Sequence, residues 1–239
     1  MSLNDPELVR AQYACEHGLA ARQAVYSTYE GIDAVELVVA AVVQARPRRV
    51  LEVGGGRGEL GARLVREAAV ELVEVDQSER MVELMRARGL DARLGDAQSL
   101  PFDDARFDCV VAAWMLYHVA DVPRTLAELA RVLRPGGQLV ATTPGADHMR
   151  ELWELLGFEL GSVRRPFSSE NGAALLSRHF ADVERQDARG TVELDREAAY
   201  RYVTSGLLPG LEPNLPEDGW PRRVAAHSVV FVARRPDGT

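Results

Sequence analysis

The sequence of 239 residues lacks several features that would indicate a membrane, an export route or a metal. It has no run of about 18 apolar residues, which argues against a membrane-spanning helix. Residues 1–7 have neither a basic start nor an apolar core, so an export signal is not expected. The two cysteines, Cys15 and Cys109, do not have metal-ligand spacing. We therefore expect a cytoplasmic protein with no membrane partner and no metal site.

An excess of basic residues is also missing, because the net charge is −8. A nucleic-acid partner that is bound through its phosphates requires a basic surface, so such a partner is not expected. Basic pairs do occur, but they are scattered among acidic residues, and we interpret them as solvated surface. These pairs are Arg48-Arg49, Arg164-Arg165, Arg222-Arg223 and Arg234-Arg235.

From residue 46 onward, short apolar segments alternate with amphipathic ones. This alternation predicts an α/β fold with a parallel sheet covered on both faces. The predicted strands are 50–53, 71–75, 92–94, 109–113, 138–142, 183–194 and 228–233. The predicted helices are 59–69, 79–88, 125–133, 147–156, 168–180 and 195–205, together with helical segments over 8–19 and 34–44. Four prolines within 208–221 predict an irregular loop there.

The apolar run Val50–Val53 contains an acid, Glu52, and is followed by four glycines within residues 54–58. A strand that stops at a glycine turn and opens into a helix is typical of α/β proteins that bind a nucleotide-like cofactor. Residues 56–61 match G-x-G-x-x-G, the dinucleotide pattern, yet the Glu52 carboxylate would face the pyrophosphate of such a ligand. Glu52 instead favours a cofactor with a positive amine or sulfonium, and we interpret the dinucleotide match as coincidental.

Two further acids follow the next predicted strands. Asp76 ends the second strand, where a carboxylate can accept both hydroxyls of a ribose. Asp96 follows the third strand, where it can accept a hydrogen bond from an adenine amine, while the N–H of Ala97 can bond a ring nitrogen. Because the carboxyl ends of parallel strands share one edge of a sheet, Glu52, Asp76 and Asp96 predict one elongated cleft.

These segments together resemble the class I S-adenosylmethionine-dependent methyltransferases of the small-molecule type, including the ubiquinone and menaquinone methyltransferases. The resemblance covers residues 46–143. It implies a Rossmann-like, doubly wound sheet of seven mostly parallel strands, with the last strand antiparallel. It also implies one domain over 1–239, divided into a helical cap (1–45), a cofactor-binding half (46–145) and a substrate-side half (146–239). The matching segments are Val50–Gly58, Val75–Ser78, Gly95–Ala97 with Leu100–Phe102, Phe107-Asp108 leading to His118, and Leu133–Gly137.

The resemblance assigns cofactor roles by position. Glu52 and the backbone of Gly54 and Gly56 would hold the methionine part, Asp76 the ribose and Asp96 the adenine amine. The carbonyl of Ala113 would face the amine of the cofactor, and Gln77 would stack on adenine. The chain departs from the family pattern at three positions: Glu52 replaces the commoner Asp, Arg57 a small residue and Gln77 an apolar one.

The methyl acceptor is harder to predict, because such an enzyme mainly aligns the acceptor and excludes water. No general-base motif is present, so no catalytic residue is assigned. The candidate acceptor-side residues are Tyr13, Tyr29, Trp114, Tyr117 and His148. Several aromatic and histidine residues also have a structural interpretation. The tyrosines would pack in the core, His148 would lie in the first turn of a surface helix, and His118 would pack or form hydrogen bonds locally. Arg22 and Tyr26 lie in the same N-terminal helices as two candidates, and His179 and His227 suggest no role.

We therefore expect an S-adenosylmethionine-dependent methyltransferase that acts on a small molecule, as a monomer or homodimer. An RNA or protein methyltransferase with the same fold, and a non-catalytic cofactor-binding module, are the alternatives. An NAD-dependent dehydrogenase is the weakest of them. The sequence identifies neither the acceptor nor whether nitrogen, oxygen or carbon is methylated.

Overall fold

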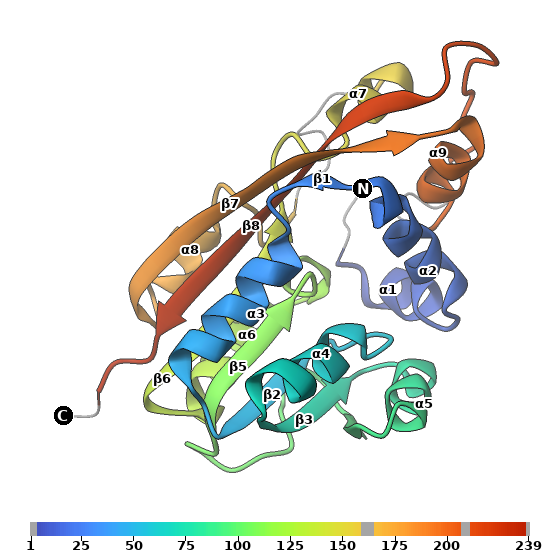
Figure 1. Ribbon diagram of the computed structural model, residues 1–239. Coiled ribbons are helices and arrows are strands. Elements are labelled where there is room, and N and C mark those ends of the chain that lie inside the picture. The colour runs from blue at the N-terminus through green and yellow to red at the C-terminus, as the bar shows by residue number, and fades with distance from the viewer. Residues whose placement is uncertain (1–3, 159–164, 207–210, 238–239) are drawn as a thin grey trace.

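The computed structural model describes residues 4–158, 165–206 and 211–237. Their strands form one eight-stranded sheet in the order β1-β7-β8-β6-β5-β2-β3-β4 (Figure 1). The strands from β4 to β6 in this order are parallel, whereas β8 runs antiparallel to both β6 and β7. The strands are β1 (Glu30–Gly31), β2 (Arg49–Val53), β3 (Glu71–Asp76), β4 (Asp91–Leu94), β5 (Phe107–Ala113), β6 (Leu133–Pro144), β7 (Ala181–Leu194) and β8 (Arg222–Arg234).

The predicted α/β class and the antiparallel last strand are confirmed, and the strand count is corrected from seven to eight. The additional strand, β1, has two residues and pairs with the edge strand β7. Two residues are too few to show an alternating pattern, so the sequence does not reveal it.

Helices cover both faces of the sheet (Figure 1). Leu51 and Val110 point toward a core that includes α6, while Val50 and Val111 point toward a second core that includes α3 and α4. This alternation is the two-residue period of strands buried on both faces. The helices are α1 (Pro6–Gln12), α2 (His17–Ala24), α3 (Ala34–Ala45), α4 (Glu59–Ala68), α5 (Glu79–Ala87), α6 (Val122–Val132), α7 (Arg150–Leu155), α8 (Gly172–Leu176) and α9 (Arg196–Val203), with short 3-10 helices η1 (Val25–Thr28) and η2 (Leu116–His118).

Several predicted elements differ from the structure; the helix expected over 147–156, for example, is only α7. Helix α6 ends at Val132, and residues 133–137 continue as β6, because the N–H of Gly136 and the carbonyl of Gly137 pair with Arg235. The helix expected over 168–180 is only α8, because the Asn171 side chain accepts the N–H of Ser168 and forms a turn before it. Of the proline-rich segment, residues 208–210 lie outside the described residues, and 211–221 form neither helix nor strand.

The N-terminal helices lie beside α9 (Figure 1). Gly18 permits this contact, because a Cβ at that position would be 2.3 Å from the carbonyl oxygen of Ser205. The Ser78 hydroxyl, at the start of α5, donates to the carbonyl of Tyr13. The helical segment expected over 8–19 is thus two helices that contact both halves of the chain. No helix in the described ranges is both long enough and apolar enough to cross a bilayer.

Candidate functional site

A cavity of about 1100 Å³ opens at the carboxyl ends of the parallel strands. Its walls come from the glycine turn after β2, the N-terminal helices, η2 and α9. It is lined by all the residues predicted for the cofactor and for the acceptor: Glu52, Gly54, Gly56, Asp76, Gln77, Asp96, Ala97, Ala113, Tyr13, Tyr29, Trp114, Tyr117 and His148.

The turn after β2 requires glycine at alternate positions. Gly54, Gly56 and Gly58 have φ values of 74°, 57° and 74°, in the left-handed region that side chains disfavour. The N–H of Gly54 donates to the carbonyl of Val75 at 2.7 Å, which joins the turn to β3. The backbone conformation therefore explains why glycine occurs at positions 54, 56 and 58 after Glu52.

Asp76, at the end of β3, connects this turn to the following helix. One carboxylate oxygen accepts the N–H of Gly56 at 3.1 Å, and the other accepts the N–H of Ser78 at 2.9 Å. Burial raises the pKa of Asp76, while these hydrogen bonds oppose the increase. Asp96 is exposed on the same cavity, and its Oδ1 accepts the N–H of Gln98 at 2.8 Å.

Glu52 is 2% exposed, and its Oε2 is buried without a hydrogen-bond partner among the described residues. Glu74, its register partner on β3, is fully buried, and among the described residues no donor other than the Glu52 carboxyl faces its carboxyl oxygens. Burial raises the pKa of Glu52 to about 7, and burial together with the charge of Glu52 raises the pKa of Glu74 well above its ordinary value. Two adjacent buried carboxyls favour a shared proton.

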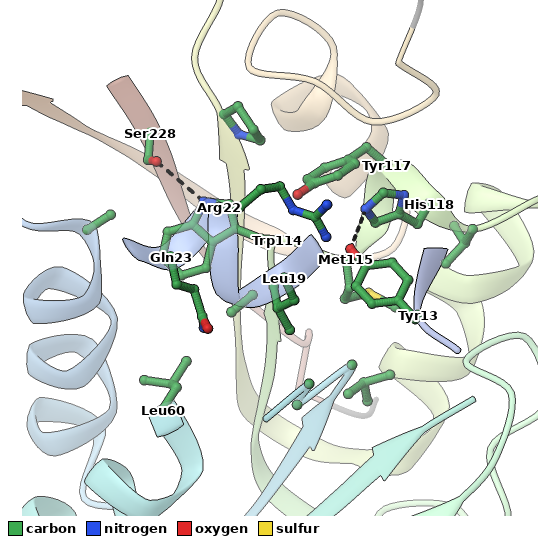
Figure 2. A pocket seen from close by; sticks show the side chains of 18 of the residues that line it. Tyr13, Leu19, Arg22, Gln23, Leu60, Trp114, Met115, Tyr117, His118 and Ser228 are labelled. Atoms are coloured by element: carbon green, nitrogen blue, oxygen red, sulfur yellow. Dashed lines mark hydrogen bonds between the residues drawn. The ribbon is translucent and has the colours of Figure 1, made fainter. Parts of the chain in front are cut away.

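The other end of the cavity is aromatic (Figure 2). The Tyr13 hydroxyl lies 2.9 Å from Nε2 of His118, and the rings of Tyr117 and His118 have centroids 4.4 Å apart. The Trp114 indole N–H donates to the hydroxyl of Ser228 at 3.4 Å. The Tyr29 hydroxyl donates to the carbonyl of Ile32 at 2.5 Å, so its polar end is already bonded within its own loop.

His148 is buried, and its ring nitrogens have different partners. Nδ1 accepts the backbone N–H of His227 at 3.2 Å, so the neutral ring carries its proton on Nε2. Nε2 lies 3.2 Å from the Tyr202 hydroxyl and 3.4 Å from that of Tyr26. Burial lowers the pKa of His148 to about 3, and the positive charge of Arg165 contributes. His148 is therefore a neutral hydrogen-bond donor toward the tyrosines.

His227, to which the sequence assigns no role, positions His148. Its own ring is 3% exposed and lies between two carboxylates, with Nδ1 bonded to Asp147 and Nε2 2.8 Å from Asp187. Gly145 permits this placement, because a Cβ there would be 2.0 Å from Nδ1 of His227. These two contacts fix the strand segment that supplies the N–H to His148.

Sequence reasoning missed four residues of this site. Glu74 reads as an ordinary strand residue, and its pairing with Glu52 appears only once β2 and β3 are in register. Gly61, which the sequence suggests only as part of a coincidental dinucleotide pattern, faces the Glu74 carboxyl from α4. Tyr202 and Arg165 border the acceptor end from the C-terminal half, where no motif marks them.

The glycine turn and the acidic strand ends define an α/β protein that binds a nucleotide-like cofactor. A family model described as a methyltransferase domain matches residues 51–141. A probable S-adenosylmethionine-dependent methyltransferase of Mycolicibacterium smegmatis is 33% identical over 220 residues, which cover 79% of this chain and 82% of that protein. The chain belongs to the S-adenosylmethionine-dependent methyltransferases, which confirms the predicted resemblance.

Other similarities are shorter or more distant. An uncharacterized methyltransferase of Mycobacterium tuberculosis is 35% identical over 170 residues, or 69% of this chain and 66% of that protein. The chain thus spans slightly less than two thirds of that relative. Among solved structures, the cyclase SpnF has a TM-score of 0.64 at 20% identity, with 96% of each chain covered. This similarity shows a shared fold only.

S-adenosylmethionine is the cofactor of this family, and the cavity fits it. The buried Oε2 of Glu52 has no partner in the described part of the chain, and it can accept hydrogen bonds from an ammonium group. At the glycine turn the backbone packs directly against the side chain of Met115, which also lines the cavity. A Cβ at Gly54 would be 2.7 Å from Cβ of Met115, so this close approach requires glycine.

Proposed function

We propose that this protein transfers the methyl group of S-adenosylmethionine to a small-molecule acceptor. The observation that carries this proposal is the convergence of Glu52, Asp76 and Asp96 on one cavity beside the glycine turn. The three acids follow three adjacent parallel strands, and they match the cationic and hydroxyl-bearing parts of this cofactor. A dinucleotide would place a pyrophosphate against the same acids.

Each residue has a distinct role in this proposal. Glu52 accepts hydrogen bonds from the ammonium group of the cofactor, with the carbonyl of Ala113 nearby, and the backbone of Gly54 and Gly56 borders the methionine part. Asp76 accepts the ribose hydroxyls. The adenine ring is held by Asp96 and by the backbone N–H of Ala97, while the Gln77 amide covers its face.

When bound, S-adenosylmethionine supplies an electrophilic methyl group on a sulfonium. The residues of the chain align the acceptor and exclude water. Tyr13, Trp114 and Tyr117 provide an aromatic wall. His148 orients the hydroxyls of Tyr26 and Tyr202. With a pKa of about 3, His148 is a weak base at neutral pH, which favours an acceptor atom that needs little base assistance.

A small molecule is favoured over RNA because the net charge is −8. It is favoured over a protein substrate because the N-terminal helices and α9 border the acceptor end of the cavity. We also propose that the chain acts as one domain in the cytoplasm, as a monomer or homodimer.

Isothermal titration calorimetry with S-adenosylhomocysteine tests cofactor binding directly. We expect saturable one-to-one binding, and no heat of binding with NADH under the same conditions. Release of S-adenosylhomocysteine from S-adenosylmethionine, measured across a panel of small amines, phenols and carbon acids, then tests transfer. Absence of S-adenosylhomocysteine binding to the folded wild type would reject the proposal.

A further inference from the structure

The acceptor end of the cavity contains a buried guanidinium with no acidic partner. Nη1 of Arg22, on α2, donates to the carbonyl of Ser205 at 2.9 Å and lies 3.4 Å from its hydroxyl. Nη2 is buried and has no hydrogen-bond partner among the described residues. Figure 2 shows the guanidinium extending into the cavity toward Tyr117 and His118. Ser205 and the Tyr13 ring, whose centroid lies 5.5 Å from Cζ of Arg22, fix the position of the guanidinium, and the described residues leave Nη2 without a hydrogen-bond acceptor.

A second arginine reaches the same region from the other half of the chain. Arg165 lines the cavity and forms no ion pair in the ranges that the structure describes. Glu170 lies on the same wall. Burial acts to raise its pKa, but hydrogen bonds with nearby serines and the charge of Arg165 lower the pKa below its usual value. No hydrogen bond or ion pair joins the Arg165 and Glu170 side chains in the described ranges. Other arginines, such as Arg63 and Arg131, form ion pairs at the surface.

Both guanidinium groups act on the same two tyrosines. Burial raises the pKa of Tyr202 to about 12, and the charges of Arg22 and Arg165 oppose the increase. Burial likewise raises the pKa of Tyr117, and the same two arginines oppose it. Arg22 lies on α2 and Arg165 in the segment before α8. The positive charges of both arginines therefore act on the same aromatic part of the cavity.

We propose that Arg22 and Arg165 form an anion-binding subsite, and that the methyl acceptor is a small aromatic molecule with a carboxylate or a similar anionic group. This inference rests on the proposed function and specifies its substrate class. An arginine that is removed from water and not paired is unfavourable, and its planar donors match a carboxylate. Tyr13, Tyr117 and Tyr202 line the same cavity and give the rest of such a molecule aromatic surroundings.

The charges of the cavity support this assignment. The acids Glu52, Asp76 and Asp96 border the end that we assign to the cofactor, whereas the two unpaired arginines border the other end. A sulfonium, once bound in the same cavity, would add another positive charge. An anionic acceptor is attracted by both the arginines and the sulfonium, while a cationic acceptor would be repelled by both.

Two fluorescent probes with the same rings test this subsite. 1-Anilinonaphthalene-8-sulfonate is anionic, and N-phenyl-1-naphthylamine is its neutral counterpart without the sulfonate. In titrations with saturating S-adenosylhomocysteine, we expect the wild type to bind the anionic probe about tenfold or more tightly than the neutral one. Arg22→Met and Arg165→Met should each reduce this ratio several-fold and leave the neutral probe unchanged.

Arg201→Met is the matched control, because Arg201 is an exposed arginine of α9. It removes the same charge outside the cavity and should keep the wild-type ratio. Arg165→Met decides the outcome if Arg22→Met does not fold, since Arg165 forms no described hydrogen bond or ion pair that the fold would lose. Equal affinities of the wild type for the two probes, or an unchanged ratio in folded Arg165→Met, would overturn the subsite.

Calorimetry with S-adenosylhomocysteine on the same samples separates this inference from the proposed function. If the wild type binds S-adenosylhomocysteine but does not prefer the anionic probe, only the subsite is rejected. If it does not bind S-adenosylhomocysteine, the proposed function is rejected, and titrations without that ligand still decide whether the arginines hold an anion.

Discussion

Glu52 and Glu74 are register partners on the parallel strands β2 and β3, both are buried from solvent, and the Glu74 carboxyl packs against Gly61 of α4. Like charges in direct contact inside a protein are strongly unfavourable, so one proton is retained between the two groups. Glu52 borders the cavity, whereas Glu74 lies behind it. In this arrangement Glu74 holds the proton and contacts Glu52, the carboxyl that we assign to the cofactor amine.

We predict that stability falls as pH rises through the neutral range because of this pair. Both carboxyls have raised pKa values in the fold, so the folded chain holds more protons than the unfolded chain above pH 4.5. The free energy of unfolding then decreases with pH, by up to about 1.4 kcal/mol per pH unit for each proton. In Glu74→Gln the free energy of unfolding should decrease less with pH, so that the variant is more stable than the wild type at pH 8.

Urea unfolding at several pH values between 5 and 8 measures this difference. The comparison of Glu74→Gln with the wild type cancels the contribution of other groups, such as His148. Glu71→Gln is an exposed change on the same strand, and its free energy of unfolding should vary with pH in the same way as that of the wild type. Parallel curves for Glu74→Gln as well would mean that Glu74 is ionised in the fold.

We predict that position 61 must be glycine because the Glu74 side chain packs against it. A Cβ at Gly61 would be 1.8 Å from Oε1 of Glu74, so Gly61→Ala should cost about 1–3 kcal/mol of unfolding free energy. In a Glu74→Ala background, the same change should cost less than about 1 kcal/mol, because alanine is the better helix former. A thermodynamic double-mutant cycle measures the coupling, and equal costs in the two backgrounds would contradict it.

Cofactor affinity should increase with pH. The Glu52 carboxyl, with a pKa of about 7, must lose its proton before it can pair with an ammonium group. The affinity for S-adenosylhomocysteine should therefore fall by up to tenfold per pH unit below pH 7, and binding should release protons. Calorimetry in buffers of different ionisation enthalpy counts these protons, and Glu52→Gln should bind more weakly without releasing them.

The convergence of Glu52, Asp76 and Asp96 on one cavity was predictable from sequence, while the contacts among Tyr26, His148 and Tyr202 were not. Glu52, Asp76 and Asp96 each follow a recognisable strand, and parallel topology alone brings strand ends to one edge. Tyr26, His148 and Tyr202 meet through packing of segments far apart in the chain, which no local pattern encodes. Their contact depends on how the N-terminal helices lie against α9.

The same distinction explains the errors in the fold. Long buried strands such as β5 have apolar runs that identify them, but β1 has only Glu30 and Gly31 and exists because it pairs with β7. Pro135 and the two glycines after it are typical of a turn, yet Arg235, directly after the antiparallel β8, pairs with Gly136 and Gly137. Tertiary pairing determines the structure in both places.

Asp76→Ala should weaken S-adenosylhomocysteine binding about 10- to 100-fold, because it removes the acceptor that we assign to the ribose hydroxyls. It also leaves the N–H groups of Gly56 and Ser78 without their carboxylate, which loosens the glycine turn. Calorimetric titration measures the dissociation constant. Asp91→Ala, an exposed change at the start of β4, is the control and should bind normally. A normal dissociation constant for Asp76→Ala would reject the ribose assignment.

His148 should remain neutral, with its proton on Nε2, throughout pH 5–8. Burial lowers its pKa to about 3, and the N–H of His227 occupies Nδ1. Long-range proton–nitrogen NMR correlation of the histidine rings identifies the tautomer, with His148→Gln for assignment. Tyr202→Phe should leave the tautomer unchanged, because His227 rather than the tyrosine selects it. A proton on Nδ1, or a titration midpoint inside this range, would show that His148 is available as a base.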